Sequence, residues 1–145
     1  MDLIPLIIVA AISGGTTLLF AVLGGILNEK AGIINLGTEG IMLVGAVMAA
    51  IMFIQTQNLF LTLVVTVVAS GILGLVHAFL CITLRTNQIV SGLAITLFGS
   101  GFSAYIGKSV AGMPIPVNIP TLDITFINSI PYIGPIFSGL NMFIL

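Results

Sequence analysis

From Leu3 to Leu27 the chain runs for 25 residues without a single acidic or basic side chain. The hydrocarbon core of a bilayer is about 30 Å thick, and a helix of about 20 predominantly apolar residues crosses it. The stretch is longer than the apolar core of a cleaved signal peptide, and Asp2 stands where such a peptide carries basic residues. We therefore predict that residues 3–27 form a membrane-spanning helix that is retained.

The composition of the whole chain supports a membrane environment. Only 5% of the residues are charged and 59% are hydrophobic, whereas ordinary soluble domains have about 25% charged residues. Disordered chains are poor in apolar residues, so that class is excluded too. With three basic residues and a net charge of -1, the chain lacks the positive surface that nucleic-acid binding requires. Membrane lipid is the expected partner, and no nucleic acid is.

Charged, polar and proline-rich breaks divide the rest of the chain into further apolar stretches. The second is short, because Ile41–Ile54 has only 14 residues and must borrow residues 33–40 to cross. Those borrowed residues include Asn35, Thr38 and Glu39, so the segment either spans with a carboxylate inside or re-enters the membrane. The predicted spans are 3–27, 33–54, 59–84 and 89–107.

Residues 108–135 hold five of the six prolines, which no continuous helix accommodates. We predict an external loop there, and the start of a further span at 136–145. Four crossings place Lys30 and Arg85 on one face of the membrane, which the positive-inside rule assigns to the cytoplasm. The predicted fold is all-α, a polytopic transmembrane helical bundle, with residues 1–145 forming part of one transmembrane domain.

Small residues recur every four positions along the predicted spans. Such residues let helix backbones approach closely in lipid, where no hydrophobic force drives association. A lone anchor has no need of these stripes, so we predict a tightly packed bundle. The predicted packing residues of the third and fourth spans are Thr66, Ser70, Gly74, Ala78, Gly99, Ser103 and Gly107.

Two polar groups lie at membrane depth. Asn35 and Glu39 are four residues apart, which places them on one helical face if the helix is continuous. With their glycines they predict a broken helix that lines a translocation path, although a solvated turn at the interface fits as well. Asn87, Gln88 and Ser91 form the second group, which either caps the fourth span or meets the first group.

Motifs for chemistry are few. Residues Gly107–Ser109 end like a phosphate-binding loop, but the required first glycine is missing at position 102 and the residues end a span. His77 and Cys81 are each the sole residue of their type, and we interpret both as packing residues. No catalytic residue, metal site or bound cofactor is expected in this chain.

The stretch Leu27–Ala46, LNEKAGIINLGTEGIMLVGA, resembles the signature of integral-membrane permeases of ATP-binding-cassette (ABC) importers for nucleosides and simple sugars, which are related to the ribose and branched-chain amino acid permeases. The run Thr86–Gly107, TNQIVSGLAITLFGSGFSAYIG, resembles a later segment of the same subunits. Residues 130–135, IPYIGP, are similar to the external loop before the next span.

This resemblance implies a transport subunit of the cell membrane, without an ATPase motif of its own. It implies a second permease subunit, a cytoplasmic ATP-binding cassette subunit that hydrolyses the ATP, and an extracytoplasmic substrate-binding protein. Asn35, Glu39, Asn87, Gln88 and Ser91 would then belong to the translocation pathway. Family members are about twice as long, so the resemblance implies an N-terminal fragment. The alternatives are a small oligomeric channel and a structural membrane subunit.

Overall fold

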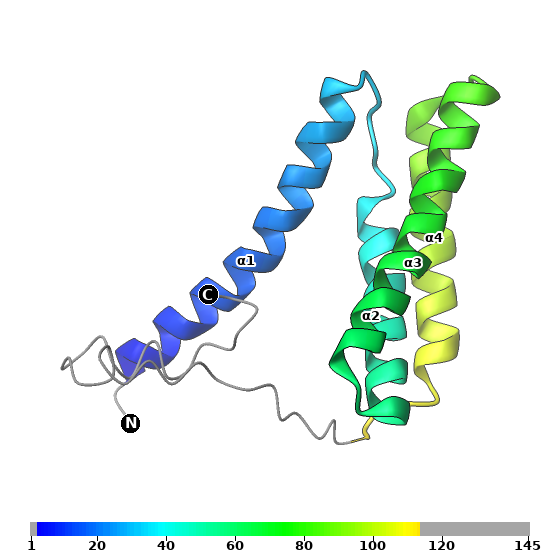
Figure 1. The fold of residues 1–145 in the computed structure, drawn as a ribbon. Coiled ribbons are helices and arrows are strands. Elements are labelled where there is room, and N and C mark those ends of the chain that lie inside the picture. Colours follow the sequence, from blue (N-terminus) through cyan, green and yellow to red (C-terminus); the bar gives the residue numbers. More distant parts are fainter. Residues whose placement is uncertain (1–2, 114–145) are drawn as a thin grey trace. The chain divides into compact units, whose positions relative to one another are not determined.

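The computed structural model describes residues 3–113, and every regular element in that part of the chain is helical. The predicted all-helical fold is thereby confirmed. Most of the predicted loop 108–135 and the predicted start of a further span at 136–145 lie outside the described residues. The elements are α1 (Leu3–Lys30), α2 (Thr38–Thr56), α3 (Leu59–Ala78), the short π-helix η1 (Phe79–Thr83) and α4 (Gln88–Gly107) (Figure 1).

The chain divides into two compact units. The described part of one unit is the first 22 residues of α1. The other comprises Gly25–Pro116 and contains the last turns of α1 with α2, α3, η1 and α4. All contacts described below lie within this second unit, which we call the α2–α4 bundle.

Among residues 3–113, four helices are long and apolar enough to cross a bilayer. They are Ile7–Lys30, Thr38–Thr56, Leu59–Thr83 and Gln88–Gly107. The third combines α3 with η1, so the polypeptide stays helical to Thr83. The second differs most from the sequence prediction, because its helix begins at Thr38 rather than at residue 33.

Polar side chains mark where the helices start. Asn58 precedes α3, and its side-chain oxygen accepts a hydrogen bond from the amide of Leu61 at 3.2 Å. Asn87 precedes α4 and accepts from the amides of Ile89 and Val90 at 3.0 and 3.3 Å. Such caps satisfy amide groups that the first helical turn leaves without partners.

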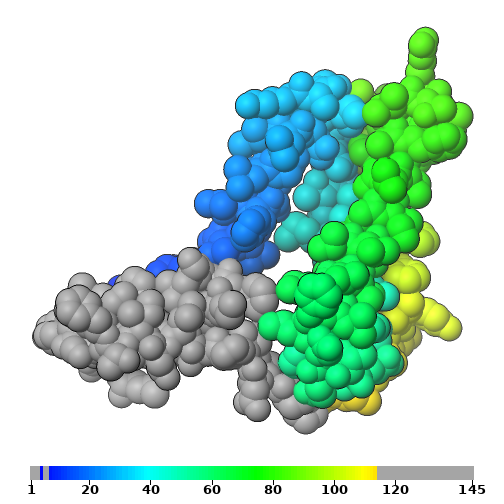
Figure 2. All heavy atoms as spheres, in the orientation of Figure 1, coloured from blue at the N-terminus to red at the C-terminus, as the bar shows by residue number. Residues whose placement is uncertain are grey.

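In the α2–α4 bundle, α2 packs extensively against both α3 and α4, whereas α3 and α4 contact each other over a smaller area. In the space-filling view the atoms of α3 cover much of one face of this unit (Figure 2). The buried apolar side chains are few: Val44, Val47, Cys81 and Ile95. Most large apolar side chains of the three helices are exposed instead, which is the arrangement expected of helices that face lipid.

Hydroxyl groups within the helices bond to their own backbone. Thr56, Thr62 and Thr66 each donate to the carbonyl four residues earlier, at 2.7 to 2.8 Å. In lipid no water is present to satisfy such groups. These bonds let hydroxyl side chains occur in apolar helices without leaving a donor unpaired.

Candidate functional site

The segment between α1 and α2 runs alongside α4 instead of forming a helix. The amide of Ile34 lies against Gln88, the backbone of Leu36 against Gly92, and Gly40 against Gly99. Further along, a Cβ on Gly107 would lie 3.3 Å from Val47. The contacts advance in the same direction along both segments, so residues 34–47 run parallel to α4 from its first residue to its last. The second segment therefore continues along α4 and does not turn back.

Gln88 fastens the non-helical segment to the start of α4. Its side-chain oxygen accepts a hydrogen bond from the amide of Ile34 at 2.8 Å, and its side-chain nitrogen donates to the carbonyl of Gly32 at 3.3 Å. Further along α4, the hydroxyl of Thr96 donates a hydrogen bond to the carbonyl of Leu36 at 2.8 Å. Backbone groups that a helix would pair internally thus find partners on α4.

Asn35 does not share a helical face with Glu39, so that part of the sequence interpretation is wrong. Asn35 precedes the helix, and its side-chain oxygen accepts from the amide of Gly37 at 2.8 Å. Its carbonyl accepts from the hydroxyl of Thr38 at 3.1 Å. These bonds form a tight turn that ends the non-helical segment, because an Asn side chain can replace a backbone partner in such a turn.

Glycine brings the backbones of α2 and α4 into direct contact. A Cβ on Gly40 would lie 2.5 Å from the carbonyl oxygen of Ile95, and one on Gly99 would collide with the carbonyl of Gly40. Near the turn, a Cβ on Gly92 would lie 2.9 Å from the amide nitrogen of Leu36. No residue with a side chain fits these positions unless the two backbones separate.

These contacts fix how deep α2 begins. Gly40 lies between the levels of Ile95 and Gly99, which are seven and eleven residues after the start of α4. At 1.5 Å per residue these levels are about 10 and about 16 Å along a helix about 30 Å long. Figure 1 likewise shows α2 starting well below the neighbouring ends of α3 and α4. Since α2 starts two residues before Gly40, the helix begins about a third of the way along α4.

Glu39 occupies the first turn of α2, next to Gly40, and its side chain is exposed. The other charged residues of the described chain lie at helix ends or just beyond them: Glu29, Lys30, Arg85 and Lys108. Within residues 3–113, Glu39 is thus the one charged side chain at the level of the interior of α4. Negative charge in the first turn of a helix is favoured by the helix dipole.

A second polar cluster joins the end of α3 to the start of α4. His77 is buried, and its Nδ1 lies 3.2 Å from the hydroxyl oxygen of Ser91, which is buried as well. The sulfur of Cys81, one helical turn further on, lies 3.7 Å from Nε2 of His77. Cys81 belongs to the π-helix η1, and such helices occur often at functional sites.

The structure places the predicted pathway residues at different sites. Asn35 and Gln88 both lie where the non-helical segment meets α4. Ser91 faces His77 on α3. Asn87 is exposed and caps α4. Their membership of a pathway stays a prediction.

The predicted packing residues lie at different contacts. Thr66 and Ser70 face α2, where a Cβ on Gly45 would lie 2.7 Å from the hydroxyl oxygen of Ser70. Ser103 has a buried hydroxyl without a hydrogen-bond partner among the described residues. Gly74 has open space around it, since nothing described lies within 4 Å of a Cβ built there. Ala78 is partly buried at the end of α3, while Gly99 and Gly107 face α2.

Sequence reasoning missed Gly92 and Thr96, two residues of α4 that contact the non-helical segment before α2. Gly92 and Gly99 are seven residues apart and therefore lie on one face of α4. This spacing was the available signal for Gly92. Nothing in the sequence indicates that Thr96 bonds to the carbonyl of Leu36, 60 residues away.

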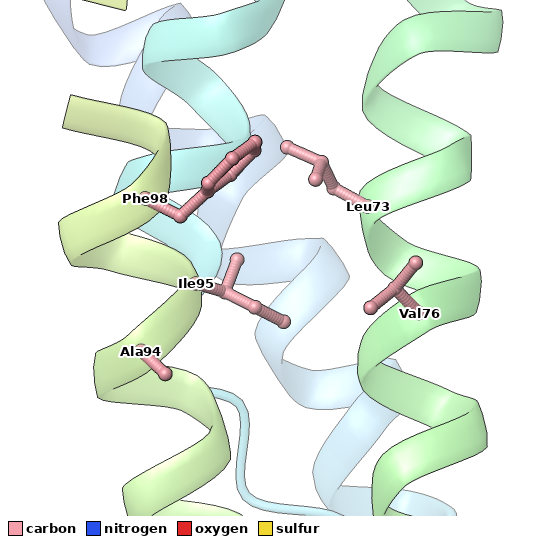
Figure 3. A pocket seen from close by; sticks show the side chains of 5 residues that line it. All are labelled: Leu73, Val76, Ala94, Ile95 and Phe98. Carbon is pink, nitrogen blue, oxygen red and sulfur yellow. The ribbon is translucent and has the colours of Figure 1, made fainter. Parts of the chain in front are cut away.

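An apolar groove of about 320 Å³ lies between α3 and α4. Figure 3 shows Leu73 and Val76 of α3 pointing toward Ile95 and Phe98 of α4, with Ala94 beside them. Every lining side chain is a hydrocarbon. The groove offers no polar group to a hydrophilic solute, so it is a packing surface for apolar groups rather than a substrate site.

Comparison with known proteins assigns this architecture to a family. The family described as "Branched-chain amino acid transport system / permease component" matches residues 7–144. A protein of Haloferax volcanii, provisionally named as the glucose ABC transporter permease TsgC13, is 41% identical over 110 residues, covering 72% of this chain and 33% of the relative. No solved structure matches the chain significantly.

Two bacterial relatives match more of the chain. The guanosine ABC transporter permease NupQ of Bacillus subtilis is 30% identical over 94% of this chain and 46% of its own length. The nucleoside ABC transporter permease NupC of Lactococcus lactis is 28% identical over 84% of this chain and 41% of its own length. The chain thus spans about a third to a half of the length of these curated relatives. It is a multi-pass protein of the cell membrane and belongs to the permease family of the branched-chain amino acid transport system type.

Proposed function

We propose that the chain is the N-terminal part of a permease subunit that carries nucleosides or simple sugars across the cell membrane in an ABC importer. Three relatives support this solute class, since their names specify glucose, guanosine and nucleosides. The guanosine permease supports it most broadly, because its match covers 94% of this chain. The substrate moves without chemical change, so the chain itself needs no catalytic residue.

The proposed complex contains further subunits. A cytoplasmic ATP-binding cassette subunit hydrolyses ATP, a second permease subunit completes the path, and an extracytoplasmic substrate-binding protein delivers the solute. Residues 107–109 do not complete a phosphate-binding loop, which agrees with ATP hydrolysis elsewhere in the complex. This chain is proposed to bind no cofactor.

The structural observation that carries the proposal is the non-helical backbone beside α4. Residues 33–37 lie between the start of α4 and its middle, at a depth where lipid cannot satisfy amide and carbonyl groups. Such backbone occurs in membrane proteins where it is enclosed by protein or lines a water-filled cavity, and many transporters place broken helices at the substrate path. A purely structural membrane subunit does not require non-helical backbone at this depth.

Alternating access is the proposed mechanism. The glycine contacts hold α2 and α4 together without side chains between them, so these two helices form one rigid element. Nucleotide-driven closure of the ATPase subunits would rock such elements against the rest of the permease. The solute path would open first to one side of the membrane and then to the other.

Uptake into vesicles tests this proposal. The permease that contains residues 1–145 would be reconstituted with its ATPase subunit and binding protein, and uptake of labelled guanosine and glucose would be measured with and without ATP. We expect saturable uptake of one class, dependent on ATP. Flux that is equal without ATP would identify a passive channel instead, and absence of both binding and flux would identify a structural subunit.

A further inference from the structure

The position of Glu39 imposes a requirement on the whole permease. Its carboxylate sits in the first turn of α2, at the level where Gly40 meets Ile95 and Gly99. A charged side chain inside the hydrocarbon core of a bilayer is costly, and such groups face a partner or a watery cavity. The exposed side chain must therefore meet something polar in the working transporter.

The face of α2 that carries Glu39 offers no other hydrogen-bonding side chain. Gly40, Val44 and Val47 are buried in the bundle, and Gly45 faces α3. Residues three, four and eleven positions further share the face of Glu39. These are Met42, Leu43 and Ala50, which are apolar. A hydrophilic solute that passes this face finds one acceptor, the carboxylate.

Nucleosides and simple sugars share one chemical feature, a sugar ring with adjacent hydroxyl groups. An ionised carboxylate is an acceptor with two oxygens, and its hydrogen bonds from hydroxyl groups are short and charge-assisted. We propose that Glu39 recognises the substrate by accepting hydrogen bonds from adjacent hydroxyls of its sugar ring inside the transporter. This inference rests on the function proposed above, and it adds a specificity-determining residue to it.

The test compares substrates that differ only in these hydroxyls. ATP-dependent uptake of a ribonucleoside and of its 2′,3′-dideoxy analogue would be measured with the complete complex, carrying either the natural residue or Glu39→Gln. We expect the ratio of the two kcat/KM values to fall by about ten-fold in Glu39→Gln, which is what one charge-assisted hydrogen bond supplies. The binding protein is the same in both complexes, so its own selectivity cancels in the comparison.

Two further variants separate the carboxylate from general effects. Glu29→Gln removes the same charge from the last turns of α1, and we expect the natural ratio. Glu39→Asp keeps an acceptor, so it should preserve more of the selectivity than Glu39→Gln. If Glu39→Gln fails to assemble, Glu39→Asp and Glu39→Ala are compared by direct nucleoside binding to the purified complex. We expect Glu39→Asp to keep the preference for the ribonucleoside over its dideoxy analogue and Glu39→Ala to lose it. Equal preferences in the two variants would overturn the acceptor role.

The outcomes distinguish this inference from the proposed function. A natural complex that transports neither nucleosides nor sugars overturns the proposed function. A complex that transports them but shows an unchanged ratio in Glu39→Gln overturns only the role of Glu39. A change in preference between guanosine and inosine, with no change between ribo and dideoxy forms, would also overturn it, because the carboxylate would then contact the base.

Discussion

Gly40 of α2 and Gly99 of α4 meet backbone to backbone, and the carbonyl of Gly40 occupies the place that a Cβ at position 99 would need. This contact joins two helices that are separated by the whole of α3. It also fixes the level at which α2 starts, since Gly40 is its third residue. The level of Glu39 along α4 therefore depends on the absence of side chains at Gly40 and Gly99.

Adding a methyl group at this contact should destabilise the bundle. We expect Gly99→Ala to lower the free energy of unfolding by about 1 to 3 kcal/mol, as overpacking of a close contact does. Reversible unfolding of the permease in mixed detergent measures the difference. Gly101→Ala is the matched control on the same helix, because nothing lies within 4 Å of a Cβ there. Equal effects of the two changes would contradict the contact.

Removing the side chain of Gln88 should release the segment that precedes α2. The Gln88→Ala change deletes the bonds to Ile34 and Gly32, each with a net contribution of about 0.5 to 1.5 kcal/mol. We expect faster hydrogen exchange at the amide of Ile34, measured by mass spectrometry, while α3 keeps its protection. Gln55→Ala, which changes an exposed residue near the end of α2, should leave the exchange of Ile34 unaltered.

His77 and Ser91 should be energetically coupled. A double-mutant cycle with His77→Ala and Ser91→Ala should give an interaction free energy of about 1 kcal/mol, typical of one hydrogen bond. A readout independent of stability is the thiol of Cys81, which is 8% exposed. We expect it to react with maleimide slowly in the natural protein and several times faster in His77→Ala. An unchanged labelling rate would mean that His77 does not shield the sulfur.

The cap of α4 distinguishes two roles for Asn87. If its role is the cap, Asn87→Ala should lower stability by about 1 kcal/mol, while Asn87→Asp, which keeps an acceptor oxygen, should retain both stability and uptake. If Asn87 also contacts the solute, uptake should fall in both variants while the complex still assembles. Parallel measurement of unfolding and uptake separates these outcomes.

The sequence predicted the helices well because each depends on a local property. Uncharged runs of the required length mark the spans. Asn87 stands at the end of the polar break before α4, and asparagine favours the position before a helix. The sequence left open whether Asn87, Gln88 and Ser91 cap the fourth span or meet the first polar group. In the structure Asn87 caps α4, and Gln88 bonds to the backbone of Gly32 and Ile34.

The rest depended on partners far away in the chain. The placement of Asn35 and Glu39 on one helical face was wrong, because the amide groups of Ile34 and Gly37 bond to side chains and not within a helix. The partner that makes this possible is Gln88, 54 residues away. The pairing of His77 with Ser91 was hidden for a similar reason, since no local periodicity relates residues on either side of a turn.

The segment before α2 is bonded to α4 at two levels. Gln88 bonds to Gly32 and Ile34 at the start of α4, and Thr96, about two helical turns further along, bonds to Leu36. Because these bonds hold the segment to α4 on both sides of Asn35, a shift of α4 would carry the start of α2 with it instead of stretching the connection.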